Sequence, residues 1–283
     1  MKALLAATVL AAAAPQEPPV FRAEVGVVRV EVLVTRGGAP VRGLSGADFE
    51  VRDNGRLQAL EPILEEETPV DALQVLDLSG SMAGTKLEAL KAAGRAFLDG
   101  LRGGEQAALL ALHHEVRLLE PLTADLGAVR WALERASAGG STALVDAVYS
   151  ALRLREPGDR RTAIVVFSDG IDNMSWLAAS DVVEAASRSN AIVYGVAVVG
   201  AGDRKERFLG DVVRATGGRL FEASSERDLR ARFLDVLGDI RTRYVLSFSP
   251  GPGTAGWHAL EVKLRRGRKG DVLARPGYWR GAP

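Results

Sequence analysis

Alternating apolar and polar positions mark the first part of the chain as β-rich. Between residues 21 and 35, valines are interleaved with charged residues such as Glu24, Arg29 and Glu31, a pattern typical of one bent strand. A second alternating segment, 49–52, runs into Asp53-Asn54-Gly55, where Asn-Gly predicts a tight hairpin because both central positions must tolerate positive φ. Residues 20–68 are therefore predicted to form the first part of a small all-β domain.

From residue 72 the pattern changes, and short apolar runs alternate with segments whose apolar residues recur at helical spacing. Alternation of this kind predicts a largely parallel sheet with helices on both faces. We therefore expect residues 70–241 to form a doubly wound α/β domain. The expected strands are 72–76, 107–112, 116–119, 163–167 and 191–199, and the expected helices are 86–101, 125–136, 142–154, 178–187, 204–215 and 226–240.

After residue 243 the chain returns to β patterning. Residues 244–249, 257–264 and 272–274 are predicted strands, which are too few to be stable alone. We expect residues 243–280 to complete the small β domain begun by residues 20–68. The predicted fold class is thus α/β, a doubly wound, mostly parallel sheet with a small all-β domain formed from the N- and C-terminal segments.

Composition limits what the molecule can recognise. The chain has 283 residues, of which 47% are hydrophobic, enough for one large core and a smaller one. Lysine plus arginine and aspartate plus glutamate both number 36, so no net field steers the chain toward nucleic acid or an anionic membrane. The absence of cysteine excludes disulfides, thiolate metal sites and a lipidated cysteine. Any partner must be recognised locally, and we do not expect nucleic acid to be one.

Residues 1–13 have the pattern of a signal peptide. Lys2 supplies a positive charge, an apolar run broken only by Thr8 follows, and Ala11-Ala12-Ala13 offers a cleavage site of small residues. The run is too short to span a bilayer, and no other stretch approaches the roughly 20 apolar residues of a membrane helix. We expect an exported protein, periplasmic or extracellular, without a transmembrane anchor.

Oxygen-bearing side chains gather at the predicted element boundaries. Asp77 and Asp169 each follow an apolar strand, and ligands of an open parallel sheet bind outside the carboxyl ends of its strands. Ser79 and Ser81 follow Asp77 closely enough for one turn to aim all three oxygens the same way. Thr142, which follows a pair of glycines, can approach from a third loop.

These five side chains are all oxygen donors. Such a set suits Mg²⁺, Mn²⁺ or Ca²⁺ and disfavours zinc and copper. Two carboxylates balance the charge of a dication, and the hydroxyls add ligands without adding charge. If water fills part of the coordination shell, a carboxylate from another molecule can replace it. The sequence therefore predicts a metal-dependent binding module.

The same residues support a resemblance to a known family. The segment Asp77-Leu78-Ser79-Gly80-Ser81-Met82, together with Thr142 and with Asp169 in Phe167-Ser168-Asp169-Gly170, resembles the metal-ion-dependent adhesion site of von Willebrand factor type A domains. The three segments occur in the family's order, each at a suitable element boundary. Residues 44–51, 244–246 and 274–278 are similar to flanking segments of the acidobacterial-type von Willebrand factor A-related proteins.

The resemblance implies a role for each matched position. In the family, the positions matching Ser79, Ser81 and Thr142 contact the ion directly or nearly so, and those matching Asp77 and Asp169 often act through water. The partner commonly offers an acidic side chain. For this chain the resemblance thus implies a divalent ion at these five residues and a protein partner that presents a carboxylate.

Three further acidic or amide side chains near the predicted site allow two interpretations each. Asp146 lies one turn into the helix predicted from Thr142, where it could support the metal site or stabilise the helix N-terminus. Asp172 and Asn173 could extend the rim of the site, but both are also typical turn formers.

The histidines give a weaker signal. The chain departs from the family by carrying His113-His114 where an aromatic residue often ends the second strand, and Glu115 follows. The H-E-x-x-H spacing is absent, and neighbouring strand residues point to opposite faces, so we expect one histidine to be buried and the other exposed. His258 lies in a predicted strand and is interpreted as structural. Nucleotide binding is not expected, because neither phosphate-loop spacing occurs.

Three classes of function fit the sequence. The leading hypothesis is an exported, cation-dependent, adhesion-type protein-binding module without enzyme activity. The alternatives are a structural envelope component with a vestigial metal site and a metal-dependent hydrolase, although the sequence offers no clearly placed catalytic base. The partner, the oligomeric state, the identity of the ion and any movement of the last predicted helix stay open.

Overall fold

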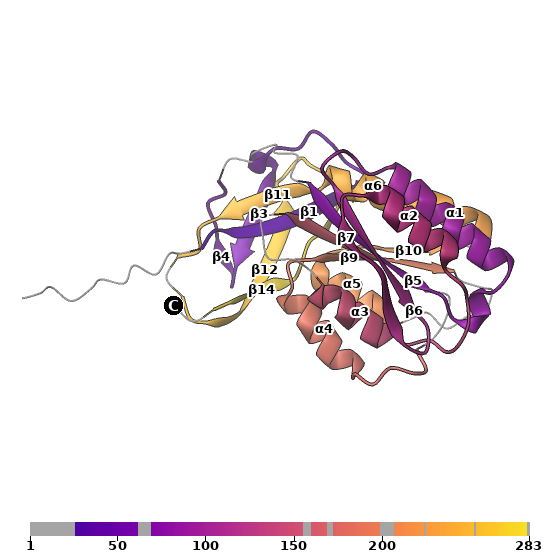
Figure 1. Cartoon of the computed structure of the whole chain (residues 1–283). Coiled ribbons are helices and arrows are strands. Elements are labelled where there is room, and N and C mark those ends of the chain that lie inside the picture. Colours follow the sequence, from indigo (N-terminus) through magenta and orange to yellow (C-terminus); the bar gives the residue numbers. More distant parts are fainter. Residues whose placement is uncertain are drawn as a thin grey trace, which may run out of the picture.

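A six-stranded sheet forms the middle of the α/β part (Figure 1). The computed structural model describes residues 26–61, 69–154, 160–168, 172–198, 207–223, 225–251 and 253–281. The strands of this sheet are β5 (Val70–Asp77), β6 (Gln106–Leu112), β7 (Val116–Thr123), β8 (Arg161–Ser168), β9 (Ile192–Val198) and β10 (Leu220–Ala223). Their order is β10-β9-β8-β5-β6-β7, and all neighbours are parallel except β6 and β7. The chain therefore reverses its direction of sheet growth around β5.

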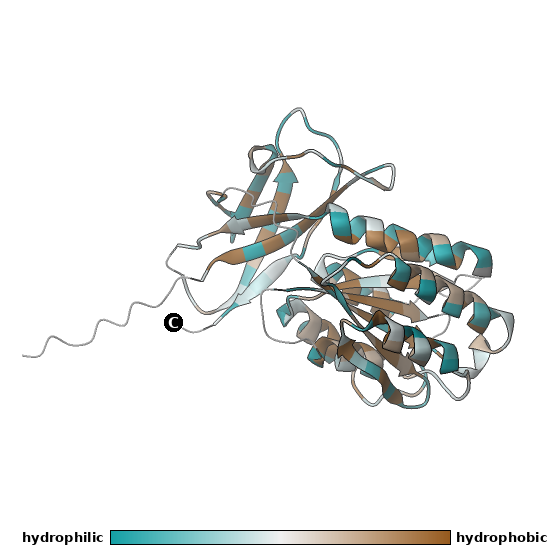
Figure 2. Ribbon diagram, turned by 45° about the horizontal axis from the view of Figure 1, so that its top comes forward, coloured by the Kyte–Doolittle hydropathy of each residue, from teal (hydrophilic) through white to brown (hydrophobic). Residues whose placement is uncertain are grey.

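Helices cover both faces of this sheet, as the continuous apolar runs of its central strands require. Every residue of β5 is buried. One face carries α1 (Thr85–Asp99), α2 (Leu126–Arg135) and α6 (Leu229–Thr242), and the other carries α3 (Leu144–Arg153), α4 (Ala179–Arg188) and α5 (Arg207–Thr216). Figure 2 shows a largely apolar sheet between helices that carry both polar and apolar residues. Two separate hydrophobic cores result.

The two ends of the chain build a second, all-β part. One sheet has the order β11-β1-β13 with β2 paired to β1, and the other has the order β14-β12-β3-β4. Their inner faces share one core that includes Val32, Phe49 and Phe248. The strands are β1 (Val28–Arg36), β2 (Ala39–Pro40), β3 (Phe49–Asp53), β4 (Arg56–Leu57), β11 (Tyr244–Phe248), β12 (Gly256–Leu264), β13 (Asp271–Leu273) and β14 (Gly277–Arg280). The predicted fold class is confirmed, including the all-β part built from both terminal segments.

The local predictions agree best with the structure where the sequence has residues with a marked preference for turns. Asn54 and Gly55 have φ of 47° and 81° and connect β3 to β4, as the Asn-Gly pair predicts. The strands β10 and β14 were not predicted, and α3 begins at Leu144 rather than at Thr142. The predicted signal peptide, residues 1–13, lies outside the described residues.

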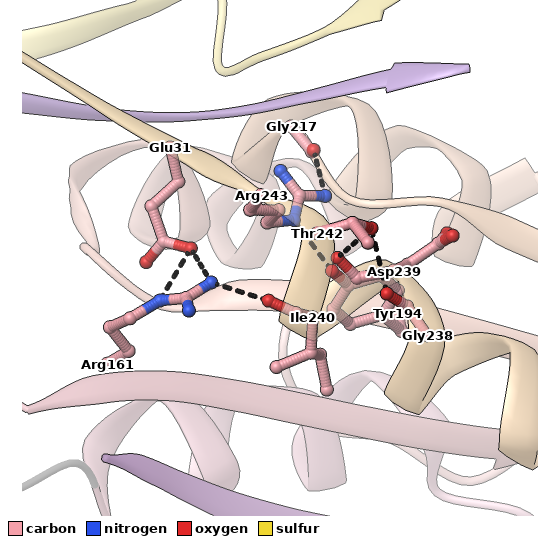
Figure 3. Close-up of polar contacts among 9 residues, drawn as sticks. All are labelled: Glu31, Arg161, Tyr194, Gly217, Gly238, Asp239, Ile240, Thr242 and Arg243. Carbon is pink, nitrogen blue, oxygen red and sulfur yellow. Dashed lines mark hydrogen bonds and ion pairs between the residues drawn. The ribbon is translucent and has the colours of Figure 1, made fainter. Parts of the chain in front are cut away.

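A partly buried ion pair joins the two parts of the molecule (Figure 3). Arg161, at the start of β8, donates to Glu31 of β1 through Nε at 3.1 Å and Nη2 at 2.6 Å, and Nη2 also donates to the carbonyl oxygen of Ile240 at 2.9 Å. The two side chains are only 18% and 16% exposed. Burial alone would lower the pKa of Arg161, but the adjacent Glu31 carboxylate raises it above the usual value. Arg161 therefore stays charged and links β1 to α6.

Arg243 forms a second link, at the junction between α6 and β11. Its Nε donates to the hydroxyl of Tyr194 at 2.6 Å, and its Nη2 donates to the carbonyl oxygen of Gly217 at 2.7 Å (Figure 3). Arg243 is 7% exposed and Tyr194 is fully buried. Burial raises the pKa of Tyr194, although the Arg243 guanidinium opposes that rise. The C-terminal end of α6 is thus fixed to both the central sheet and the β part.

We predict that Arg161→Ala destabilises the chain by about 3 kcal/mol, because it leaves the Glu31 carboxylate partly buried without its charged partner. The control is Arg95→Ala, which removes an exposed ion pair with Glu134 and should cost less than about 1 kcal/mol. Chemical denaturation of both variants measures the difference. Equal losses would show that the Glu31–Arg161 pair contributes no more than a surface pair.

Candidate functional site

The candidate site begins with a carboxylate buried at the carboxyl end of β5. Asp77 is 0% exposed. Its Oδ1 accepts the backbone N–H of Ser79 at 2.9 Å, and its Oδ2 accepts the hydroxyl of Ser168, the last residue of β8, at 2.9 Å. A buried carboxylate is costly unless such donors are present. Asp77 therefore fixes the turn after its own strand and ties that turn to the neighbouring strand.

This turn presents two serine hydroxyls together. It continues into a short 3₁₀ helix, η2 (Gly80–Met82), for which Ser79 is the N-cap. The Oγ atoms of Ser79 and Ser81 lie 3.0 Å apart. Ser79 is 2% exposed, whereas Ser81 lies at the surface. The structure thus brings Asp77, Ser79 and Ser81 into one turn, of which Ser81 is the exposed member.

The loop that carries Thr142 is hydrogen-bonded to this turn through its two glycines. Gly139 N–H donates to the carbonyl oxygen of Leu78 at 2.7 Å, and Gly80 N–H donates to the carbonyl oxygen of Gly140 at 2.9 Å. Gly140 has a φ of 79°, in the left-handed region. Thr142 follows two residues later and is 5% exposed. The loop before α3 and the turn after β5 therefore form one unit.

Residues after β8 complete the surroundings of Thr142. Thr142 N–H donates to the side-chain oxygen Oδ1 of Asn173 at 3.0 Å, and Asn173 N–H donates to the carbonyl oxygen of Thr142 at 3.1 Å. Asp169 lies outside the described residues, so the structure does not place the fifth predicted ligand. Three chain segments meet here: the turn after β5, the loop before α3 and the loop after β8.

The loop after β8 also caps α3. Asp172 is a turn former in this loop, as one of its two interpretations predicts, because its Oδ1 accepts the N–H of Ser175 at 3.1 Å. Asp172 Oδ2 accepts the N–H of Val145 at 2.8 Å, and Ser175 Oγ accepts the N–H of Asp146 at 3.0 Å. The N-cap residue of α3, Ala143, supplies no side-chain cap. Asp172 and Ser175 therefore do from another loop what a Ser or Asp would do at the N-cap.

Asp146 lies in the first turn of α3, and its carboxylate binds the loop after β8. Its Oδ2 and Oδ1 accept the N–H groups of Trp176 and Leu177, each at 3.0 Å. The carboxylate therefore holds the loop after β8 rather than capping its own helix. Sequence reasoning also missed the part played by the Ser168 hydroxyl, although Ser168 directly precedes Asp169.

Two histidines and a glutamate lie at the edge of this site. His113, His114 and Glu115 form the turn between β6 and β7, and Ala143 N–H donates to the carbonyl oxygen of His113 at 3.0 Å. The rings of His113 and His114 stack with centroids 5.1 Å apart and an interplanar angle of 22°. As predicted, one histidine is buried, His113, and the other, His114, is exposed. Strand alternation is not the reason, because β6 ends at Leu112 and the two rings stack. Burial lowers the pKa of His113, and neighbouring His114 adds to the effect.

Comparison with known proteins finds a family match within the α/β part. Residues 73–171 match the family model described as the von Willebrand factor type A domain. This stretch is similar to a von Willebrand factor type A domain. The matched segment runs from β5 to the end of β8 and includes all five residues predicted to bind metal. Among curated proteins, no match was found.

Solved structures share the fold at low identity. A von Willebrand factor type A protein from Catenulispora acidiphila is 16% identical with a TM-score of 0.55, over 89% of this chain and 73% of that one. Proximal thread matrix protein 1 from the mussel byssus, described with a zinc-occupied MIDAS motif, is 18% identical with a TM-score of 0.53, over 63% and 47%. The vWF domain of the type V pili tip protein Mfa5 from Porphyromonas gingivalis is 14% identical with a TM-score of 0.51, over 61% and 95%.

We predict that Gly140→Ala loosens the candidate site. A Cβ at this position would lie 2.6 Å from Nδ1 of His114, and φ of +79° disfavours any side chain, so we expect a loss of about 1–2 kcal/mol in unfolding free energy. The control is Gly139→Ala, since a Cβ there would meet nothing within 4 Å. Thermal and chemical unfolding measure both variants. Indistinguishable stabilities would mean that the Gly140 backbone conformation is not required.

Proposed function

We propose that this chain is an exported protein-binding module of the adhesion type, in which a divalent cation bridges the von Willebrand factor type A domain to an acidic group of a partner protein. The ion would be Mg²⁺, Mn²⁺ or Ca²⁺. Ser79, Ser81 and Thr142 would offer hydroxyl oxygens, and Asp77 and Asp169 would offer carboxylates.

The observation that most supports the proposal is the arrangement around Asp77. Its carboxylate, the paired hydroxyls of Ser79 and Ser81, and the loop carrying Thr142 meet at the carboxyl end of a parallel sheet. Open α/β sheets bind ligands at this end, near the point where strand order reverses. All the donors are oxygens, as a hard cation prefers.

The charge balance of this donor set explains why an acidic partner would be recognised. Two carboxylates neutralise a dication, and the hydroxyl ligands add no further negative charge. A partner carboxylate can therefore approach the ion and replace a bound water. Ser81 is exposed, so a partner could reach this part of the turn.

Exposed apolar side chains in the loop after β8 favour a protein as the partner. Trp176 is 92% exposed, Met174 is 46% exposed and Leu177 is 39% exposed. Asp146 fixes the backbone of Trp176 and Leu177, so this apolar group is held beside the Thr142 loop. Aromatic residues and methionine are enriched in protein interfaces.

The proposal includes export and no catalysis. No described helix has both the length and the apolar character needed to cross a membrane. The mussel protein is described with metal in its MIDAS motif and Mfa5 as a pilus tip protein, which supports an adhesion-type role by likeness of fold. Incubation of the purified protein with phosphoester and peptide libraries should give no turnover in the presence of Mg²⁺. Turnover lost in Asp169→Ala would contradict the non-enzymatic assignment.

We predict that Ser81→Ala and Thr142→Ala each weaken Mg²⁺ binding by at least about tenfold, because each removes an oxygen ligand while leaving the buried Asp77 interactions in place. Isothermal titration of the full chain with Mg²⁺ measures this. The control is Ser150→Ala, whose hydroxyl donates to the carbonyl oxygen of Asp146 inside α3. Unchanged Mg²⁺ affinity in Thr142→Ala, or no Mg²⁺ binding by the unaltered chain, would overturn the assignment.

A pulldown from envelope extract tests the partner half of the proposal. The unaltered chain should retain a protein in Mg²⁺ and release it when a chelator is added, and Thr142→Ala should retain none. If the partner protein is retained equally well with and without chelator, and equally well by Thr142→Ala and the unaltered chain, the metal does not bridge to the partner.

A further inference from the structure

We propose that His113, His114 and Glu115 form a second metal site, selective for a borderline transition ion such as Zn²⁺, at the edge of the hydroxyl-lined site. The three residues offer one ligand atom each, two imidazole nitrogens and a carboxylate oxygen, and these atoms all lie within 4.8 Å of one another. This inference does not depend on the proposed function, because it concerns different side chains and a different ion.

The turn between β6 and β7 already holds these groups together. The imidazole rings stack at a centroid distance of 5.1 Å, so both rings lie on the same side of the turn. His113 N–H donates to the carbonyl oxygen of Glu115 at 3.2 Å, which closes the turn and brings the first and third residues together. A small movement of these side chains would turn all three donor atoms toward a single ion.

The donor chemistry distinguishes this site from the one at Asp77. Imidazole and carboxylate together suit zinc, whereas Mg²⁺ prefers oxygen ligands and retains its water. Three protein ligands leave a fourth position of a tetrahedral zinc ion open to water or to another donor. The two neighbouring sites should therefore discriminate between ions by donor type.

One ring nitrogen is buried and lacks a hydrogen bond. His113 is 9% exposed, and its Nδ1 has no hydrogen-bond partner among the described residues. A buried polar atom of this kind normally has a partner. Coordination of an ion would satisfy it. The positive charge of Arg117 opposes binding of a cation here, because its Nε lies 3.4 Å from Oε1 of Glu115. Both side chains are exposed, however, and can separate.

The position of the turn connects this second site to the first. His114 Nδ1 packs against Gly140, close enough that a Cβ there would lie 2.6 Å away, and the carbonyl oxygen of His113 accepts the N–H of Ala143. Both contacts flank Thr142. An ion held by the histidines would therefore stiffen the loop that presents Thr142 and add positive charge beside it.

Titration of the full chain with Zn²⁺ in excess Mg²⁺ tests this proposal, because Mg²⁺ then occupies the oxygen site. A chromophoric zinc indicator measures affinity, and two-dimensional NMR of the imidazole nitrogens shows which histidines respond. We expect one Zn²⁺ per chain, with shifted signals for His113 and His114 and an unshifted signal for His258, which is hydrogen-bonded to Asp53. His114→Ala should weaken Zn²⁺ binding at least tenfold, and Glu115→Gln should weaken it less.

Two control variants make the outcome decisive. Glu120→Gln removes a carboxylate from the same hairpin, on β7, and should leave Zn²⁺ affinity unchanged. Thr142→Ala should lower Mg²⁺ affinity while retaining Zn²⁺, so failure at one site is distinguishable from failure at the other. Zn²⁺ affinity that is equal in His114→Ala and the unaltered chain, or lost in Thr142→Ala alone, would place zinc at the oxygen site and overturn the proposal. No Zn²⁺ binding in excess Mg²⁺ would also overturn it.

Discussion

The candidate site depends on one buried charge. Asp77 has no exposed surface, so its carboxylate must find hydrogen-bond donors inside the protein. The N–H of Ser79 and the hydroxyl of Ser168 meet that need, and by doing so they bend the chain after β5 and bind it to the end of β8. The hydroxyls of Ser79 and Ser81 are brought together as a consequence. The hydrogen bonds that satisfy the buried Asp77 carboxylate are thus the same ones that place the candidate ligands Ser79 and Ser81.

A second set of polar contacts lies at the other end of the strands, near the C-terminal end of α6. Glu31 from the N-terminal strand and Arg161 from β8 pair there, and Arg243 reaches Tyr194 and Gly217 (Figure 3). These buried contacts make the small β part an extension of the α/β part rather than an independent module. These contacts lie near the start of β8, whereas the candidate site lies at the opposite end, where β5 and β8 finish.

The sequence predicted the fold class well because its signals are periodic and local. Apolar runs alternating with helical spacing predicted the parallel sheet, and Asn54-Gly55 predicted a hairpin from turn chemistry alone. The strand β10 was missed because it is only four residues long and follows two glycines. The two-residue delay of α3 was missed because its N-terminal amides are capped by Asp172 and Ser175 from another loop, a long-range contact without a local pattern.

The candidate site was predictable as a set of residue types, but not as an arrangement. Spacing after Asp77 indicated that Ser79 and Ser81 could share a turn, whereas nothing local revealed that Asp146 fixes the loop after β8 or that His113 and His114 stack. Crystals soaked in Mn²⁺ provide the most direct test, because anomalous scattering locates the ion without assumptions. The account predicts one peak within bonding distance of the Ser79, Ser81 and Thr142 oxygens. A peak elsewhere, with these hydroxyls turned away from one another, would contradict it.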